Sequence, residues 1–196
     1  MSKEEYLKEP IDTFTIWLHK QLSTTKNSYS SSCVLSTQGL DGFPNARTVS
    51  LKSIENHCLI ITGTSLSRKG KEIAKNPKVA LTFWWEETKR QVRIQGIAST
   101  ISEEDAHFFF NDRNYESQVI SSISNQGAAT DDIESLRVRF RESVQKNDPV
   151  KKPSHWSGWK ITPHRIEFLE FNPSRFHDRR LYIKTEDGWD ATFLEP

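Results

Sequence analysis

Cationic side chains gather in short segments of the sequence that could bind an anion. Near the C-terminus, "SRFHDRR" contains Arg175, His177 and Arg179, and a strand over this stretch would point all three toward one face. Neighbouring cations repel one another unless an anion or carboxylates lie opposite them. The pattern therefore favours a negatively charged ligand over the alternative, a solvated surface strand.

A second cationic segment, "SRKGK", places Arg68 and Lys69 in the first turn of a predicted helix. Cations there oppose the helix dipole, yet the free backbone N–H groups at the same end attract phosphate. The sequence leaves two interpretations open, a phosphate site and an ordinary solvated turn. A nucleotide P-loop is excluded, because Glu72 stands where Ser or Thr would hold magnesium.

Two predicted strands, "ARTVSLK" and "RQVRIQG", carry further candidates. Arg47 shares a strand face with Val49 and Leu51, whereas Lys52 lies on the opposite face. An arginine among apolar neighbours needs a carboxylate or an anionic ligand, and the pattern is consistent with either. Gln91 could both donate to and accept from a heterocycle edge, although most such glutamines face solvent.

Composition excludes several other classes of protein. The chain has 196 residues, which suits one domain, and its net charge of +1 gives no general attraction to nucleic acid or to a membrane surface. Cys33 and Cys58 form neither a disulfide framework nor a metal motif, and the histidines are scattered. There is no secretory signal and no apolar run of membrane-spanning length. We therefore expect a cytoplasmic protein with no metal, no nucleic acid and no membrane partner.

The periodicity of apolar residues predicts strands at both ends of the chain, with helices among them. The predicted helices cover residues 10–23, 65–77, 102–113 and 133–145, and a capping box at Ser102 begins the third. The predicted strands cover residues 32–37, 46–54, 58–63, 78–85, 90–100, 157–171, 175–184 and 189–194. This order favours an α+β fold built on an antiparallel, barrel-like sheet.

Taken in order, seven segments resemble the pyridoxamine 5′-phosphate oxidase family, the FMN-dependent enzymes of vitamin B6 metabolism. They are "ARTVSLK", "SRKGKEIAKNP", "RQVRIQG", "FFFNDRNYESQ", "SNQG", "HWSGWKITPHRIEF" and "RFHDRRLY". The resemblance implies an antiparallel split β-barrel with flanking helices, forming a single FMN-binding domain over residues 1–196. It also implies an N-terminal helical segment at 1–25 and strands in 155–196 that complete the site and a homodimer.

The resemblance also implies which residues form the site. Those expected to bind FMN are Arg47, Thr48, Val49, Leu51, Lys52, Thr62, Gly63, Arg68, Lys69 and Gln91, with Gln126 and Arg179 from the partner subunit and Gly127 beside Gln126. Those expected to bind the substrate are Lys52, Phe109, Arg113, Ser117, Arg175 and His177. Arg175 and His177 are the expected catalytic pair, lying over the pyridine ring.

The implied activity is the oxidation of pyridoxamine or pyridoxine 5′-phosphate to pyridoxal 5′-phosphate, with dioxygen as acceptor and peroxide as product. The implied partners are a small phosphorylated pyridine and a second copy of the chain. The sequence departs from the family pattern at Phe109, Gly127 and Leu169, which stand in place of tyrosine, serine and tryptophan. Two alternatives therefore stay open: an FMN oxidoreductase of another small aromatic substrate, as in phenazine pathways, or a flavin-binding protein without turnover.

Overall fold

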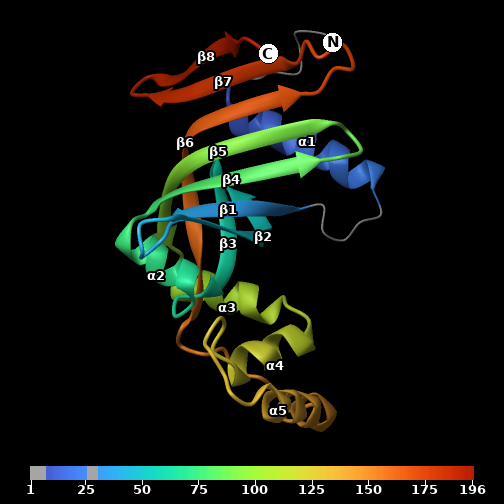
Figure 1. Ribbon diagram of the computed structural model, residues 1–196, viewed down its shortest axis with the longest axis vertical. Coiled ribbons are helices and arrows are strands. Elements are labelled where there is room, and N and C mark those ends of the chain that lie inside the picture. The colour runs from blue at the N-terminus through green and yellow to red at the C-terminus, as the bar shows by residue number, and fades with distance from the viewer. Residues whose placement is uncertain (1–7, 26–30) are drawn as a thin grey trace.

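The computed structural model describes residues 8–25 and 31–196, and its elements confirm the α+β prediction (Figure 1). In these residues the order is α1 (Pro10–Thr24), β1 (Ser32–Gln38), β2 (Pro44–Glu55), β3 (Cys58–Thr64), α2 (Arg68–Lys75), β4 (Lys78–Trp85), β5 (Arg90–Thr100), α3 (Glu103–Asn111), α4 (Tyr115–Ile123), α5 (Ile133–Lys146), β6 (Trp156–Glu170), β7 (Asp178–Thr185) and β8 (Gly188–Leu194). Residues 1–7 of the predicted N-terminal segment lie outside the described part. No described helix combines the length and apolar character that crossing a membrane requires.

The strands form one antiparallel sheet that closes on itself. Their order is β3-β2-β1-β4-β5-β6-β7-β8, and β3 also pairs with β6, so the first six strands of that order form a barrel. The long strand β6 pairs with β3 through residues 156–161 and with β7 through residues 165–170. The hairpin of β7 and β8 therefore extends beyond the barrel, and the predicted split barrel is confirmed.

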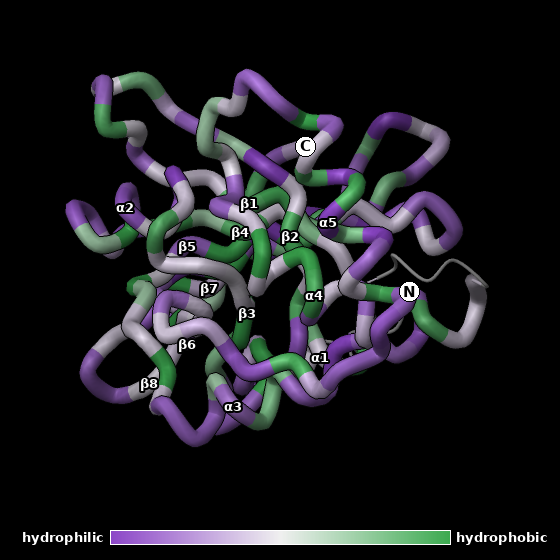
Figure 2. Tube along the Cα trace, turned by 90° about the horizontal axis from the view of Figure 1, so that it is seen from below, coloured by the Kyte–Doolittle hydropathy of each residue, from purple (hydrophilic) through white to green (hydrophobic). Residues whose placement is uncertain are grey.

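The barrel interior is filled by alternate residues of its strands, and helix α1 covers one side of it. Phe14 and Trp17 of α1 are fully buried, and the Trp17 ring lies edge-on to Phe168 of β6 at 5.1 Å between ring centroids. Leu22, which fits the apolar period of the helix, is exposed, while Gln21 is buried and hydrogen bonds to Glu87. In the view along the long axis, hydrophobic segments mark the central strands β1, β3 and β4 (Figure 2).

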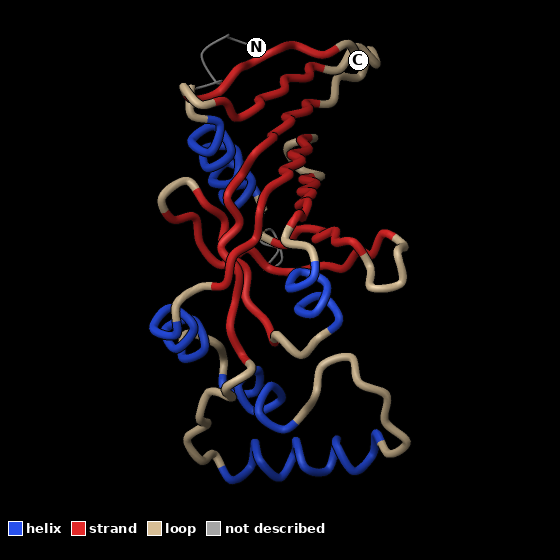
Figure 3. The backbone as a smooth tube through the Cα atoms, turned by 90° about the vertical axis from the view of Figure 1, so that its left-hand side faces the viewer, coloured by secondary structure: helices blue, strands red, loops and turns tan. Residues whose placement is uncertain are grey.

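Helices α3, α4 and α5 gather at the end of the molecule opposite β7 and β8 (Figures 1 and 3). The predicted cap of α3 is confirmed, because the Ser102 hydroxyl accepts the Asp105 backbone N–H at 3.0 Å. Helix α4 was not predicted. Its serine-rich sequence buries only Val119 and so shows no apolar period, but its cap is plain, since Asn114 accepts the Ser117 N–H at 2.9 Å.

The prediction of a strand from residue 175 was wrong, since β7 begins at Asp178. Asn172 and Pro173 start a turn instead, in which the Asn172 side chain accepts the Ser174 N–H at 3.0 Å. Arg175 then adopts a left-handed conformation with φ 68°. Arg175 and His177 therefore lie in the turn, and the strand alternation that grouped them with Arg179 does not apply.

Candidate functional site

A cavity of about 580 Å³ opens between the barrel and helix α4. Its walls come from strands β2 and β3, the first turn of α2, the segment from Asp112 to Gln126, and Trp156 at the start of β6. The predicted site residues that line it are Thr48, Val49, Lys52, Thr62, Gly63, Lys69, Arg113, Ser117 and Gln126. The fold thus brings five separate sequence segments to one place, including the cationic phosphate-binding candidates Lys52, Lys69 and Arg113.

Lys69 places a largely buried ammonium group in the cavity wall. Its side chain is largely buried, and its Nζ donates to Oε1 of Gln126 at 2.7 Å and to Oγ of Ser67 at 3.4 Å. Burial, and secondly the charge of Arg47, hold the pKa of Lys69 below its usual range. In the described part of the chain no carboxylate lies within ion-pair distance of Lys69, so this cation is available for an anion in the cavity.

Gln126 reaches Lys69 from the same chain. The resemblance assigned Gln126 to the partner subunit, but the loop after α4 brings it to the Lys69 ammonium within one chain. Both side chains line the cavity. The contact between Lys69 and Gln126 thus forms within one chain.

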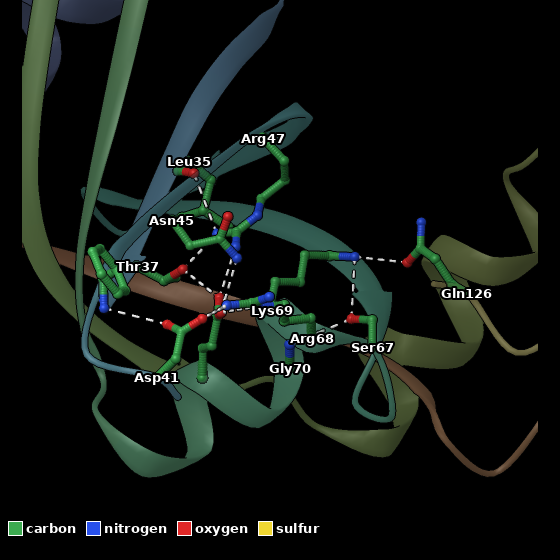
Figure 4. A network of polar contacts seen from close by, with 12 residues as sticks. Leu35, Thr37, Asp41, Asn45, Arg47, Ser67, Arg68, Lys69, Gly70 and Gln126 are labelled. Carbon is green, nitrogen blue, oxygen red and sulfur yellow. Dashed lines mark hydrogen bonds and ion pairs between the residues drawn. The ribbon is translucent and has the colours of Figure 1, made fainter. Parts of the chain in front are cut away.

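The carboxylate of Glu72 organises a buried polar network, whose donors Thr37, Asn45, Arg47 and Arg68 are labelled in Figure 4. Glu72 is fully buried and accepts hydrogen bonds from Thr37 at 2.6 Å, Asn45 at 2.8 Å, Arg47 at 2.7 Å and Arg68 at 2.9 Å. Burial alone would raise the pKa of Glu72, but these four donors outweigh it and lower the pKa to about 2. The sequence left two partners open for Arg47, a carboxylate and an anionic ligand, and the structure supplies the carboxylate of Glu72.

The two cations of "SRKGK" have different surroundings. Arg68 donates to Glu72 and also to Asp41, at 2.7 Å, whereas Lys69 extends away from it toward Gln126 (Figure 4). Arg47 and Arg68 do not line the cavity. Of the three basic residues that the resemblance assigned to the FMN site near α2, only Lys69 faces the cavity directly. Sequence could not separate them, because Asp41 and Glu72 decide which way each side chain turns.

Arg113 forms the second cationic wall of the cavity. Its Nη1 donates to Oγ of Ser121 at 2.7 Å, and its guanidinium lies over the Trp156 ring, 5.2 Å from the centroid. Burial lowers the pKa of Arg113 from its usual value. Within residues 8–25 and 31–196 no carboxylate lies within ion-pair distance of this guanidinium. Arg113 is thus held by a neutral hydroxyl and an aromatic face, and its charge is left for a ligand.

Helix α4 lines the cavity with small polar side chains. Asn114, Ser117, Ser121 and Ser124 follow one another at helical intervals of three or four positions, so they share one helix face. Ser117 was predicted through the resemblance, whereas Ser121 and Ser124 were not predicted. The sequence does contain a signal for this helix, because the cap residue Asn114 is followed by serines at helical spacing.

Three further predicted residues do not line the cavity, two because they are buried in the cores and one because it lies in an exposed loop. Leu51 is buried in the barrel core, and Phe109 is buried in a second cluster with Phe110 and Trp156. Phe109 offers no polar atom in any case. Gly127 follows Gln126 in the loop, with φ 81°, and does not line the cavity either.

The remaining predicted residues form a separate group around β5, β6 and β7. Gln91, Leu169 and Arg179 are register partners across the three strands, and Nη2 of Arg179 donates to the buried Glu167 at 2.6 Å. In the adjoining turn, Nδ1 of His177 accepts the Asn172 backbone N–H at 3.1 Å. This turn and β7 lie toward the end of the molecule opposite α4 (Figures 1 and 3). One chain therefore does not bring Arg175 and His177 to the cavity.

The barrel, with a cavity against its wall that is lined by Lys52, Lys69 and Arg113, defines an α+β protein with a site suited to a small anion. Residues 19–147 match the family described as pyridoxamine 5′-phosphate oxidase, and residues 156–196 match the pyridoxine 5′-phosphate oxidase C-terminal dimerisation region. The chain is 35% identical to the pyridoxine/pyridoxamine 5′-phosphate oxidase of Trichormus variabilis, covering 100% of this chain and 92% of that one. It is 36% identical to the protein of the same name from Rubrobacter xylanophilus, covering 96% and 87%. The chain belongs to the pyridoxamine 5′-phosphate oxidase family and is an oxidoreductase.

Solved structures share the fold. PhzG from Burkholderia lata 383, in complex with tetrahydrophenazine-1-carboxylic acid, superposes with a TM-score of 0.93 at 26% identity and covers 100% of this chain and 98% of its own. A pyridoxamine 5′-phosphate oxidase-related, FMN-binding protein from Nostoc punctiforme gives a TM-score of 0.76 at 18% identity, covering 94% and 96%. The second likeness concerns the fold alone.

Proposed function

We propose that this chain is an FMN-dependent oxidase that converts pyridoxamine or pyridoxine 5′-phosphate to pyridoxal 5′-phosphate. The observation that carries the proposal is the pair Lys69 and Arg113, two partly or largely buried cations in one cavity. Neither has a carboxylate partner among the described residues, so each can take a phosphate. The names of the relatives support the same activity.

The residues around Lys69 fit the phosphate end of FMN. A buried ammonium without a carboxylate partner suits a phosphate, and Thr62, Gly63 and Gln126 border the same part of the cavity wall. Thr48 and Val49 of β2 would lie along the rest of the cofactor. When bound, FMN supplies a hydride acceptor that dioxygen reoxidises, with peroxide as product.

The residues around Arg113 fit the phosphate of the substrate. The planar guanidinium can bind two phosphate oxygens at once, and Lys52 and Ser117 line the cavity beside it. The first turn of α4 adds the positive end of a helix dipole on the same side. These groups bind and orient the substrate, so that its reactive carbon is held against the cofactor.

We further propose that the working unit is a homodimer in which the partner completes the site. None of Arg175, His177 and Arg179 lines the cavity of its own chain. Strand β7, which carries Arg179, and the turn before it lie toward the end of the molecule opposite α4 (Figures 1 and 3). The match of residues 156–196 to a dimerisation region supports a second copy that would bring these residues to the cavity. His177 would present Nε2–H there, because its Nδ1 already accepts the Asn172 N–H.

A second candidate is an oxidoreductase of another small aromatic substrate. The solved relative PhzG, at 26% identity, is in complex with a tetrahydrophenazine carboxylic acid. The buried, apolar Phe109 also offers no hydroxyl to a substrate phosphate. Both observations are compatible with a cavity that accepts a carboxylate instead of a phosphate.

The deciding experiment is a visible spectrum of the purified protein, followed by anaerobic titration with pyridoxamine 5′-phosphate. We expect a flavin band that bleaches during the titration, and peroxide release when air is admitted. A flavin band that bleaches only with a reduced phenazine carboxylate would favour the second candidate. A yellow protein that neither substrate bleaches would indicate flavin binding without turnover, and a colourless protein that does not take up FMN would reject the proposal.

A substitution at Gly63 tests the proposed binding of the FMN phosphate at Lys69. A Cβ at residue 63 would lie 2.9 Å from Cε and 3.1 Å from Nζ of Lys69, so Gly63→Ala must push the ammonium aside. Since a flexible side chain can move, we expect the melting temperature to hold while FMN affinity falls roughly tenfold. Flavin fluorescence titration measures the affinity. Unchanged FMN affinity in this variant would contradict the placement of the phosphate at Lys69.

A further inference from the structure

The Ser121 hydroxyl occupies an unusual position in the cavity wall. Its Oγ accepts the Arg113 Nη1–H at 2.7 Å, which uses one lone pair and leaves its own O–H free to donate. In the described residues the Ser121 hydroxyl makes no hydrogen bond as a donor. Both Ser121 and Arg113 line the cavity, so the free O–H and the guanidinium are available to the same anion.

Other hydroxyls of helix α4 are used within the helix. Ser122 donates to the Val119 carbonyl at 2.8 Å and Ser124 to the Ile120 carbonyl at 2.5 Å, a common local arrangement for serine. Ser121 instead points across to Arg113, eight residues earlier. The contact fixes the guanidinium from one side, while the Trp156 ring supports its face.

We propose that Ser121 is a binding and positioning residue that makes the cavity selective for a phosphate monoester. This inference rests on the function proposed above. Ser121 holds the Arg113 guanidinium in place and donates its own O–H to the same anion. A phosphate presents three terminal oxygens, enough for the Arg113 fork, Ser117 and Ser121 together, whereas a carboxylate presents two. The Ser121 hydroxyl therefore stabilises the phosphorylated ligand selectively.

The test compares Ser121→Ala with the matched control Ser122→Ala, which removes an exposed hydroxyl outside the cavity on the same helix. Binding of pyridoxal 5′-phosphate and of pyridoxal to the flavin-loaded protein is measured by absorbance titration. We expect Ser121→Ala to raise the Kd for pyridoxal 5′-phosphate about tenfold and to leave the Kd for pyridoxal unchanged. Ser121→Thr, which keeps the hydroxyl, should restore most of the affinity. With pyridoxamine 5′-phosphate as substrate, KM should rise in Ser121→Ala with little change in kcat.

The outcomes separate this inference from the proposed function. If the unmodified protein binds pyridoxal 5′-phosphate and Ser121→Ala binds it as tightly as Ser122→Ala, the role of Ser121 is rejected and the proposed function stands. An equal loss for pyridoxal and its phosphate would also reject phosphate selectivity. If the unmodified protein binds no pyridoxal 5′-phosphate, the proposed function fails and this inference fails with it. Melting temperature and flavin content per chain, expected to match in all variants, exclude misfolding as a cause.

Discussion

Replacing Lys69 with methionine is expected to weaken FMN binding by about 10–100-fold. A hydrogen bond between a buried cation and an anion contributes roughly 1.5–3 kcal/mol, and Lys69 is the one basic side chain near α2 that lines the described cavity. Methionine keeps much of the length and apolar volume of lysine but removes the charge. Equilibrium titration of the flavin-free protein with FMN, followed by flavin fluorescence, measures the change.

The same substitution should not destabilise the flavin-free protein. Burial already lowers the pKa of Lys69, and no described carboxylate compensates its charge, so removal of the ammonium relieves a desolvation cost. We expect the melting temperature without FMN to stay level or rise. Lys71→Met, at an exposed position two residues further on, is the control and should alter neither quantity. If both variants lose FMN equally, the affinity depends on general charge and the specific role of Lys69 is disproved.

Replacing Glu72 with glutamine is expected to lower the free energy of unfolding by roughly 3 kcal/mol at neutral pH. Removing one partner of a buried ion pair leaves the other charge uncompensated, and here the guanidinium of Arg47 would remain beside a neutral amide. The amide can also accept fewer of the hydrogen bonds that now come from Thr37, Asn45 and Arg68. Urea unfolding, with Glu104→Gln on the exposed side of α3 as control, measures the loss.

The acid stability of the protein should depend on the same carboxylate. The pKa of Glu72 falls from 4.5, the ordinary value that an unfolded chain retains, to about 2 in the folded chain. Its stabilisation is therefore complete above pH 4.5 and is lost as the pH falls toward 2. This contribution amounts to roughly 3 kcal/mol. Glu72→Gln should accordingly lose less stability than the unmodified protein between pH 4.5 and 2. If the free energies of unfolding of Glu72→Gln and the unmodified protein fall in parallel with pH, other groups control acid unfolding.

Much of the fold could be predicted from the sequence because its signals are local. Alternation in "RQVRIQG" depends only on the pleat, and the cap at Ser102 depends on a residue three positions away. Helix α4 was missed because it packs a mostly polar face against a cavity and has no apolar period to detect. The strand from residue 175 was predicted too early because the turn at Asn172 uses a left-handed residue that is not glycine.

The site was less predictable because side-chain direction depends on distant residues. Arg68 and Lys69 are neighbours in sequence, yet Asp41 and Glu72 draw one away from the cavity while Gln126 draws the other toward it. Of the segments that reach the cavity, "ARTVSLK" and "SRKGK" were candidates from their own residues, whereas the segment from Arg113 to Gln126 was found through the resemblance. Ser121 was missed because its role depends on Arg113, eight residues earlier, being turned toward it.

The length of strand β6 restricts where residues can be inserted into or deleted from this chain. β6 runs as one strand from Trp156, at the cavity, to Glu170, beside the turn that carries Arg175 and His177, with a register shift against β5 between Pro163 and Arg165. At about 3.3 Å per residue its 15 residues measure roughly 50 Å if fully extended. The length of β6 therefore sets the separation between the cavity and the turn that carries Arg175 and His177. A single inserted or deleted residue would change the length of β6, and the side chains beyond it would exchange their inward and outward directions. Length variation should therefore accumulate in connections such as 124–132, while β6 keeps its length.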